Sequence, residues 1–314
     1  MIPLRQHVIS IVAVFLALAV GVVLGSQTVA ADLLHGLRAD KTDLRKQVDT
    51  ISEQNRRLID ELDAADRFIA GSAGRILGGT LADRSVVVFT TPDADPADIE
   101  AVTKGFDTSG ATVTGRIALT DALLDTTEGD RLRTTITNVI PAGAQLRSGA
   151  VDQGSMAGDL LGLVLLLDQA NSQPRSTPQE LSLALETLRG GGFLGYGDTP
   201  VAPAQLAVVV TGDGARSSEN GQGSNIARFA GALRGRAAGV VLSGRSGAAD
   251  NPGPIAAIRS DAALATTVTT VDNLDRDIGR VTTVLGLSEQ LGGGAGRYGT
   301  GTKANSLTLV ALPG

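Results

Sequence analysis

The sequence predicts an α/β protein with an N-terminal transmembrane helix and a coiled-coil stalk, followed by a Rossmann-like α/β domain that has possible duplicated halves. Three observations predict this organisation: a long apolar run near the N-terminus, a heptad pattern after it, and later short apolar runs that alternate with helical stretches. The expected order is a cytoplasmic N-terminus (1–7), a transmembrane helix (8–28), a stalk (32–70) and an extracytoplasmic domain (80–314), with candidate halves at 80–170 and 200–292.

The apolar run comes first in the chain. Between Val8 and Gly25 the only polar side chain is Ser10. As a helix this run is about 27 Å long, close to the thickness of a bilayer core. Arg5 precedes it and the first charge after it is Asp32, so the positive-inside rule predicts a single-pass inner-membrane anchor with the C-terminal body outside the cytoplasm. The alternative is a cleaved signal peptide, although the run is longer than a usual signal core.

Small residues recur every four positions within the apolar run. They are Ala13, Ala17, Gly21 and Gly25. This spacing places them on one helix face, where a second helix can approach closely. We expect this face to take part in dimerisation.

A heptad pattern follows from Leu34 to Ile69. The a positions are Leu34, Lys41, Val48, Asn55, Leu62 and Ile69, and the d positions are Leu37, Leu44, Ile51, Leu58 and Ala65. Asparagine at an a position is a known device for fixing register and a two-stranded state. The pattern therefore predicts a parallel homodimer whose stalk contacts are Leu37, Leu44, Val48, Ile51, Asn55, Leu58, Leu62 and Ile69.

The alternative for this stretch is an amphipathic helix folded back on its own α/β domain. After the stalk, glycines at positions 71, 74, 78 and 79 predict a break in the helix that acts as a hinge.

The C-terminal part alternates strand and helix signals. The apolar runs Val86–Phe89, Ala207–Val210 and Gly239–Leu242 are continuous, as in parallel strands buried on both faces. A further strand is expected at 112–119, and helices at 96–109, 155–167, 178–188, 224–234 and 277–291. Asp95 before Pro96 predicts a helix start, and Gly110 a stop. Similar strand–helix–strand patterns in the two halves suggest a duplication.

Two glycine-rich segments invite a nucleotide-binding interpretation, and both depart from the required pattern. After a predicted strand, Gly212 and Gly214 are followed by Ser217 in place of a third glycine, and no helix is expected directly behind it. In Gly292–Gly301, Thr302 separates the last glycine from Lys303. We interpret the first as a structural turn and the second as a flexible surface loop in which Arg297 and Tyr298 could contact a partner.

The composition argues against an enzyme, a bound cofactor or a soft-metal centre. The chain has no cysteine, and its two histidines, His7 and His35, precede the α/β domain, so an ordinary catalytic triad cannot be built there. Copper(I) prefers thiolate and thioether ligands, and the one methionine after Met1 is Met156. Asp93, Asp95 and Asp98 could hold a hard cation, but helix capping and solvation explain them more simply.

Charge and aromatic content argue against two further classes of protein, nucleic-acid-binding proteins and transmembrane β-barrels. The formal net charge is −6 with scattered basic residues, which gives no nucleic-acid footprint. Aromatic residues make up 3% of the chain with no tryptophan, unlike a transmembrane β-barrel with aromatic girdles.

Strings along the whole chain resemble the MctB family of mycobacterial copper-transport proteins. They are Leu4–Val8, Ala13–Ala19, Gly21–Ser26, Ser85–Phe89, Thr91–Ala94, Pro141–Leu146, Val151–Ser155, Ala157–Gly162, Gly279–Leu285 and Gly292–Gly299. None of them is a catalytic or metal-ligand motif.

The resemblance implies an actinobacterial cell-envelope protein linked to copper efflux and homeostasis, in a family also described as an outer-membrane channel. Corynebacterial relatives of the SteB type look instead like anchored coiled-coil proteins that work with a partner in cell division and control of peptidoglycan hydrolysis. One spanning helix per chain gives no channel unless many chains assemble. We therefore expect an anchored homodimeric scaffold that binds a second envelope protein, with the channel and the cell-division regulator as alternatives.

Overall fold

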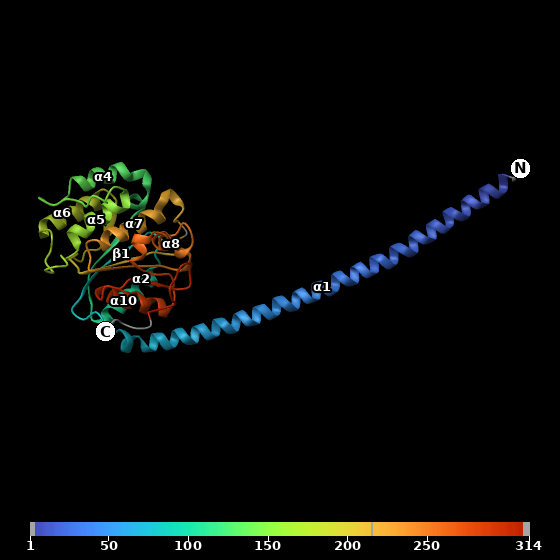
Figure 1. Ribbon diagram of the computed structural model, residues 1–314, viewed down its shortest axis with the longest axis horizontal. Coiled ribbons are helices and arrows are strands. Elements are labelled where there is room, and N and C mark those ends of the chain that lie inside the picture. The colour runs from blue at the N-terminus through green and yellow to red at the C-terminus, as the bar shows by residue number, and fades with distance from the viewer. Residues whose placement is uncertain (1–3, 215, 310–314) are drawn as a thin grey trace. The chain divides into compact units, whose positions relative to one another are not determined.

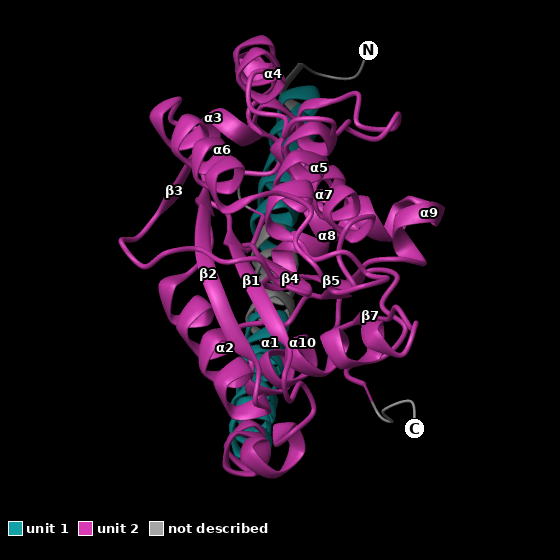
Figure 2. Cartoon of the chain, turned by 90° about the vertical axis from the view of Figure 1, so that its left-hand side faces the viewer, with its two compact units in different colours: residues 1–65 teal, residues 66–314 magenta. Residues whose placement is uncertain are grey.

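The computed structural model describes residues 4–214 and 216–309, and the side chains at positions 4–5 and 26–39 lie outside that description. The chain divides into two compact units, residues 1–65 and 66–314 (Figures 1 and 2). One helix, α1 (Leu4–Leu77), supplies the first unit and the start of the second.

The second unit contains a mixed set of strands and helices. In chain order they are β1 (Ser85–Thr90), α2 (Pro96–Ser109), β2 (Thr112–Leu119), α3 (Asp121–Leu124), α4 (Gly129–Thr137), α5 (Gln153–Leu165), α6 (Pro178–Gly190), β3 (Leu194–Tyr196), β4 (Leu206–Val210), α7 (Gln222–Arg234), β5 (Gly239–Ser243), α8 (Pro254–Ser260), α9 (Ala262–Ala265), β6 (Thr269–Val271), α10 (Asp277–Leu291) and β7 (Arg297–Tyr298). The predicted α/β class and the N-terminal apolar helix are confirmed.

The strands form one seven-stranded sheet in the order β3-β2-β1-β4-β5-β6-β7. All neighbouring pairs are parallel except β2 with β3. The chain winds outward from the centre in both directions, because β1 is followed by β2 on one side and β4 by β5 on the other. The sheet thus reverses its winding between β1 and β4.

Alternate side chains of the central strands enter two separate cores. Val87 and Phe89 of β1 pack with α4, α5, α6, α7 and α8, whereas Val86 and Val88 pack with α2, α10 and the end of α1. Figure 1 shows the two helical layers on opposite faces of the sheet. Burial on both faces explains why these strands are continuous apolar runs, since neither face meets water.

Capping residues set the ends of the helices. Asp95 caps α2 by accepting a hydrogen bond from the N–H of Ala97, and Gly110 ends it in a left-handed conformation, as predicted. Asp152 and Ser155 form a capping box at the start of α5, so this helix begins two residues before the expected Ser155.

The expected break of α1 at its first two glycines is wrong. The helix continues through Gly71 and Gly74 and ends at Leu77, just before Gly78 and Gly79. Ser72 and Leu77 are buried on the second unit, and such tertiary packing outweighs the low helix propensity of glycine.

Candidate functional site

The N-terminal part of α1 carries a membrane-length apolar segment. Gln6–Gly25 has a mean hydropathy of 2.9 and is the one span within the described residues that is long and apolar enough to cross a bilayer. Its side chains are all exposed, including Ala13 and Ala17, and a Cβ at Gly21 or Gly25 would have no neighbour within 4 Å. In the single chain, the predicted small-residue face is therefore uncovered.

A second uncovered surface lies further along α1. Large apolar side chains recur there mostly at spacings of three, four and seven, which places them on one side of the helix. We call this the apolar face, and it consists of Leu44, Val48, Ile51, Leu58, Ile59 and Leu62, each 53–61% exposed.

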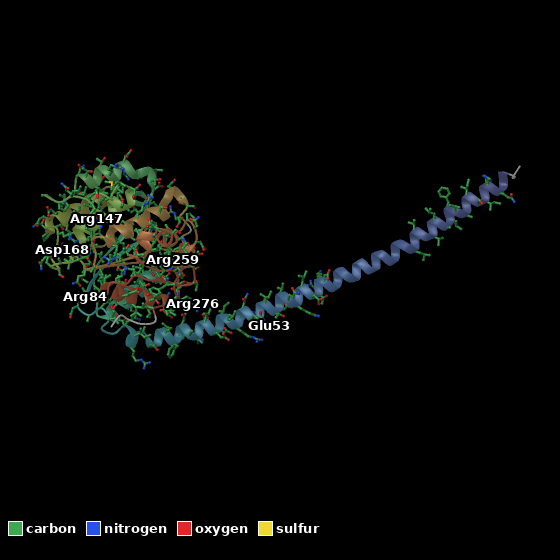
Figure 3. All side chains as sticks on the ribbon, viewed as in Figure 1. Glu53, Arg84, Arg147, Asp168, Arg259 and Arg276 are labelled. Carbon is green, nitrogen blue, oxygen red and sulfur yellow. The ribbon has the colours of Figure 1, made fainter. Side chains whose placement is uncertain are left out.

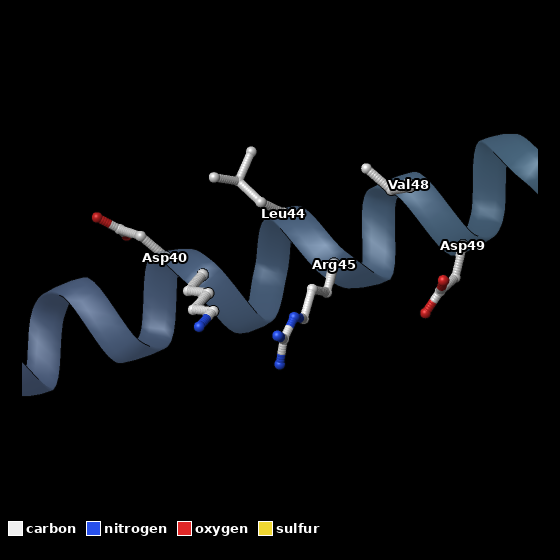
Figure 4. Close-up of a pocket in the computed structure, with 6 residues that line it drawn as sticks. Asp40, Leu44, Arg45, Val48 and Asp49 are labelled. Carbon is white, nitrogen blue, oxygen red and sulfur yellow. The ribbon is translucent and has the colours of Figure 1, made fainter.

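The close-up of α1 shows how this face is presented. Leu44 and Val48 point to one side of the helix, and Arg45 and Asp49 point to the other (Figure 4). The hollow at these residues is lined by α1 alone, from Asp40 to Asp49, so it is open helix surface rather than an enclosed cavity.

The other predicted stalk contacts differ from one another. Asn55 is exposed in line with the apolar face, whereas the side chain of Leu37 lies outside the described residues. Ile69 is partly buried against the core of the second unit, beside Ala73. The carboxylate of Asp66, one turn earlier, lies 2.5 Å from Nε of Arg276 (labelled in Figure 3). From Asp66 onward this stripe of α1 is therefore occupied by its own domain, and the open apolar face ends near Leu62.

The carboxyl edge of the sheet between β1 and β4 is where doubly wound sheets commonly bind ligands. Here the loops after the two strands are packed against each other. A Cβ at Gly212 would lie 2.1 Å from the carbonyl oxygen of Asp93, and one at Gly214 would lie 3.0 Å from that of Gly247. These glycines permit close contact between protein loops, which supports the structural interpretation of this turn.

The three aspartates after β1 are committed to protein partners. Asp95 also pairs with Nη2 of Arg245 at 2.7 Å, and buried Asp98 bridges Arg245 at 2.7 Å and Arg280 at 3.1 Å. Asp93 accepts a hydrogen bond from the Thr91 hydroxyl. The described residues contain no group of three or more His, Cys, Asp or Glu side chains placed to hold a metal ion.

Comparison with known proteins identifies the family. The sequence model described as "Copper transport outer membrane protein, MctB" matches residues 1–309. The chain belongs to the MctB family. It is 42% identical over 312 residues to the copper transporter MctB of Mycobacterium bovis, with 98% of this chain and 99% of the relative aligned. The Mycobacterium leprae copper transporter MctB is likewise 42% identical, over 315 residues and the same shares of both chains.

The potential soft ligands of this MctB-family chain are not gathered in its α/β domain. Met156 lies on α5 in the core, 9% exposed, and His7 lies at the start of α1. The His35 side chain is outside the described residues. The domain thus has no thiolate or imidazole to offer copper(I), and one buried thioether cannot complete a coordination sphere.

The expectation of a flexible surface loop at Gly292–Gly301 is wrong. The loop contains β7, and Tyr298 is 5% exposed. Asp272, directly after β6, accepts hydrogen bonds from the backbone N–H groups of Thr300 at 2.7 Å and Gly301 at 3.1 Å. The glycine-rich backbone therefore binds a carboxylate of its own chain.

Arg259 on α8 completes this clamp (Figure 3). It pairs with Asp272 at 2.5 Å and donates to the carbonyl oxygen of Tyr298 at 2.8 Å, and both charged side chains are fully buried. Burial lowers the pKa of Arg259 from its usual value, and the hydrogen bond to Asp272 opposes that shift. Sequence reasoning missed this pair, although an aspartate at a strand end was a usable signal.

A second buried carboxylate, Asp159 on α5, holds two arginines. Nε of Arg147 lies 2.6 Å and Nε of Arg236 lies 2.9 Å from its Oδ1. Burial would raise the pKa of Asp159, but the hydrogen bonds from Arg236 and Arg147 outweigh it and hold the pKa below its ordinary range. This cluster joins the loop before α5 to the turn after α7.

Proposed function

We propose that this MctB-family chain is a membrane-anchored envelope protein of copper homeostasis that acts as a parallel homodimeric scaffold and binds a second envelope protein. The observation that carries the proposal is the apolar face of α1. Six large apolar side chains remain more than half exposed on one side of a single helix, at heptad-like spacing. A second copy of the same helix would cover them.

The membrane arrangement rests on the N-terminal segment. Gln6–Gly25 would span the bilayer, with Arg5 in the cytoplasm and residues 32–314 outside it. Both copies of a dimer would then leave the same membrane surface, which suits a parallel seam. The small-residue face from Ala13 to Gly25 would extend that seam into the membrane.

The link to copper rests on the relatives, which are called copper transporters. The donor set of the α/β domain favours an indirect role, in which this chain supports another envelope component that handles the metal. We assign the chain no catalytic reaction and no resident cofactor. The competing function is a channel, favoured by the family description "outer membrane protein", and it would require many copies around a pore.

We further propose that the second unit is Rossmann-like and consists of two related halves. Its central strands support this, since Val86 lies opposite Leu206 and Val88 opposite Val208 in a continuous register. The units β1-α2-β2 and β4-α7-β5 also extend in opposite directions from that central pair.

Single introduced cysteines test the dimer, because the natural chain has none. Leu44→Cys and Leu58→Cys place the thiol at d positions of the apolar face. Lys46→Cys and Asp60→Cys, at f positions on the opposite side, are the matched controls. Each full-length variant is oxidised in membranes and analysed by non-reducing electrophoresis.

The parallel dimer predicts a disulfide-linked dimer for the two d-position variants and little for the two controls. Equal crosslinking of all four variants, or none at Leu44 and Leu58, would contradict it. A detergent-solubilised mass of many copies would favour the channel.

A further inference from the structure

A groove on the second unit lies between the start of α5, the middle of α7 and α9. Its volume of about 430 Å³ falls within the usual range for small-molecule sites. We call it the Arg228 groove, and it is lined by Arg147, Gly149, Ala150, Asp152, Ser155, Arg228, Gly231, Ala232, Asp261, Ala263 and Leu264.

Small and apolar residues line part of this groove. Gly231 and Ala232 lie on α7, and Leu264 faces them from α9. A Cβ at Gly231 would lie 2.4 Å from Cδ2 of Leu264, so the glycine lets the Leu264 side chain pack directly on α7 and form an apolar wall of the groove. This part of the groove suits an aliphatic side chain.

Three of the four charged residues in the groove are already hydrogen-bonded within the chain. Asp152 accepts from the N–H of Ser155 at 3.0 Å, and Asp261 accepts from the N–H groups of Ala263 and Leu264 at 2.9 and 3.1 Å. Arg147 is held by Asp159. These contacts fix the orientation of the three side chains, while Asp152 and Asp261 keep their negative charge.

Arg228 differs from the other three. Its side chain is 53% exposed, and its contact within the described part of the chain is an ion pair at 3.8 Å between Nε and Oδ2 of Asp152. That distance is too long for a hydrogen bond. Because Nε faces Asp152, the two Nη groups are left to bind a ligand carboxylate in the bidentate geometry that guanidinium favours.

We propose that the Arg228 groove binds the carboxyl-terminal residue of a peptide that ends in an aliphatic side chain. The terminal carboxylate pairs with Arg228, and the side chain lies against Gly231, Ala232 and Leu264. This site lies on the second unit and does not depend on the proposed dimerisation of α1.

The test uses the full-length chain in lipid nanodiscs and isothermal titration calorimetry. The probes are N-acetyl-Ala-Leu with a free carboxylate and the same dipeptide as its carboxamide. The free acid is expected to bind at least about tenfold more tightly than the amide, as for loss of one charge-assisted contact.

Three variants locate the interaction. Arg228→Gln is expected to abolish the preference for the acid, whereas Arg133→Gln, an exposed arginine on α4 outside the groove, is expected to keep it. Leu264→Ala is expected to weaken both probes, because it removes an apolar contact to the aliphatic side chain of the ligand. Equal binding of acid and amide, no binding of either, or an undiminished acid preference in Arg228→Gln would overturn the proposal.

Discussion

Apolar side chains of the same types are buried in the second compact unit of this chain and exposed in the first. Val87 and Val88 of the central strand β1 are fully buried. In contrast, Val48 of α1 is 60% exposed, and Leu44, Leu58 and Leu62 of the same helix are 53–61% exposed. The second unit covers its apolar residues with its own helices on both faces of the sheet. In the first unit the side chains that the structure describes, at 6–25 and 40–65, have no such cover, so we infer that their partners are a bilayer and another helix.

The largest effect is expected from breaking the buried clamp of the second unit. Asp272→Ala leaves the Arg259 guanidinium buried without its counter-charge, which should cost about 3–5 kcal/mol of unfolding free energy. Chemical denaturation of the full-length protein measures this. Arg216→Gln is the control, because Arg216 pairs with the half-exposed side chain of Asp121 and should contribute less than about 1 kcal/mol. Similar losses in both variants would show that burial does not distinguish these pairs.

A leucine pair compares the two units directly. Leu233→Ala, at a fully buried position of α7, should destabilise the second unit by about 2–5 kcal/mol. Leu62→Ala, at a position 53% exposed, should leave that unit's stability nearly unchanged and weaken self-association instead. Denaturation and sedimentation of both variants separate these outcomes. If Leu62→Ala lost stability without loss of association, the apolar face would be packing within its own chain.

Acidification should lower the stability of the second unit, because it protonates the buried carboxylate of Asp159. Because the folded-state pKa of this carboxyl is lowered, its stabilising contribution is present above its unfolded pKa of about 3.9 and is lost as pH falls through the lower folded value. Thermal unfolding of the natural chain and of Asp159→Asn between neutral and acidic pH measures this. The variant should be less stable at neutral pH and lose less on acidification. Parallel curves would remove Asp159 from the explanation.

The smallest effect is expected at Asn55. Asn55→Leu should strengthen pairing of the stalk but loosen its choice of register and oligomeric state. Sedimentation velocity would then show mixed species, whereas Asp60→Ala on the opposite side should not change the distribution. A single unchanged dimer in Asn55→Leu would mean that Asn55 does not set the oligomeric state.

Signals from neighbouring residues in the sequence were sufficient to predict several helices and strands of the second unit. The bounds of α2 follow from Asp95, Pro96 and Gly110, because caps act over a few neighbouring residues. The strands β1 and β4 follow from continuous valine runs. In contrast, β6 and β7 have three and two residues, too few to show a period.

The remaining features depend on residues that are distant in sequence. Arg259, Asp272 and Thr300 form one clamp only after α8, β6 and the C-terminal loop have come together. Likewise, the heptad pattern places Ile69 and Leu62 in the same stripe, but the first packs on its own domain and the second is open. Periodicity identifies an apolar stripe and does not identify what covers it.

The central claim is that a second copy of the chain covers the apolar face of α1. The most direct test is the light-scattering mass of residues 32–314, which lack the membrane segment but retain Leu44 to Leu62. The account predicts twice the mass of one chain, reduced toward one chain by Leu62→Ala. A monomer at concentrations well above micromolar would contradict it.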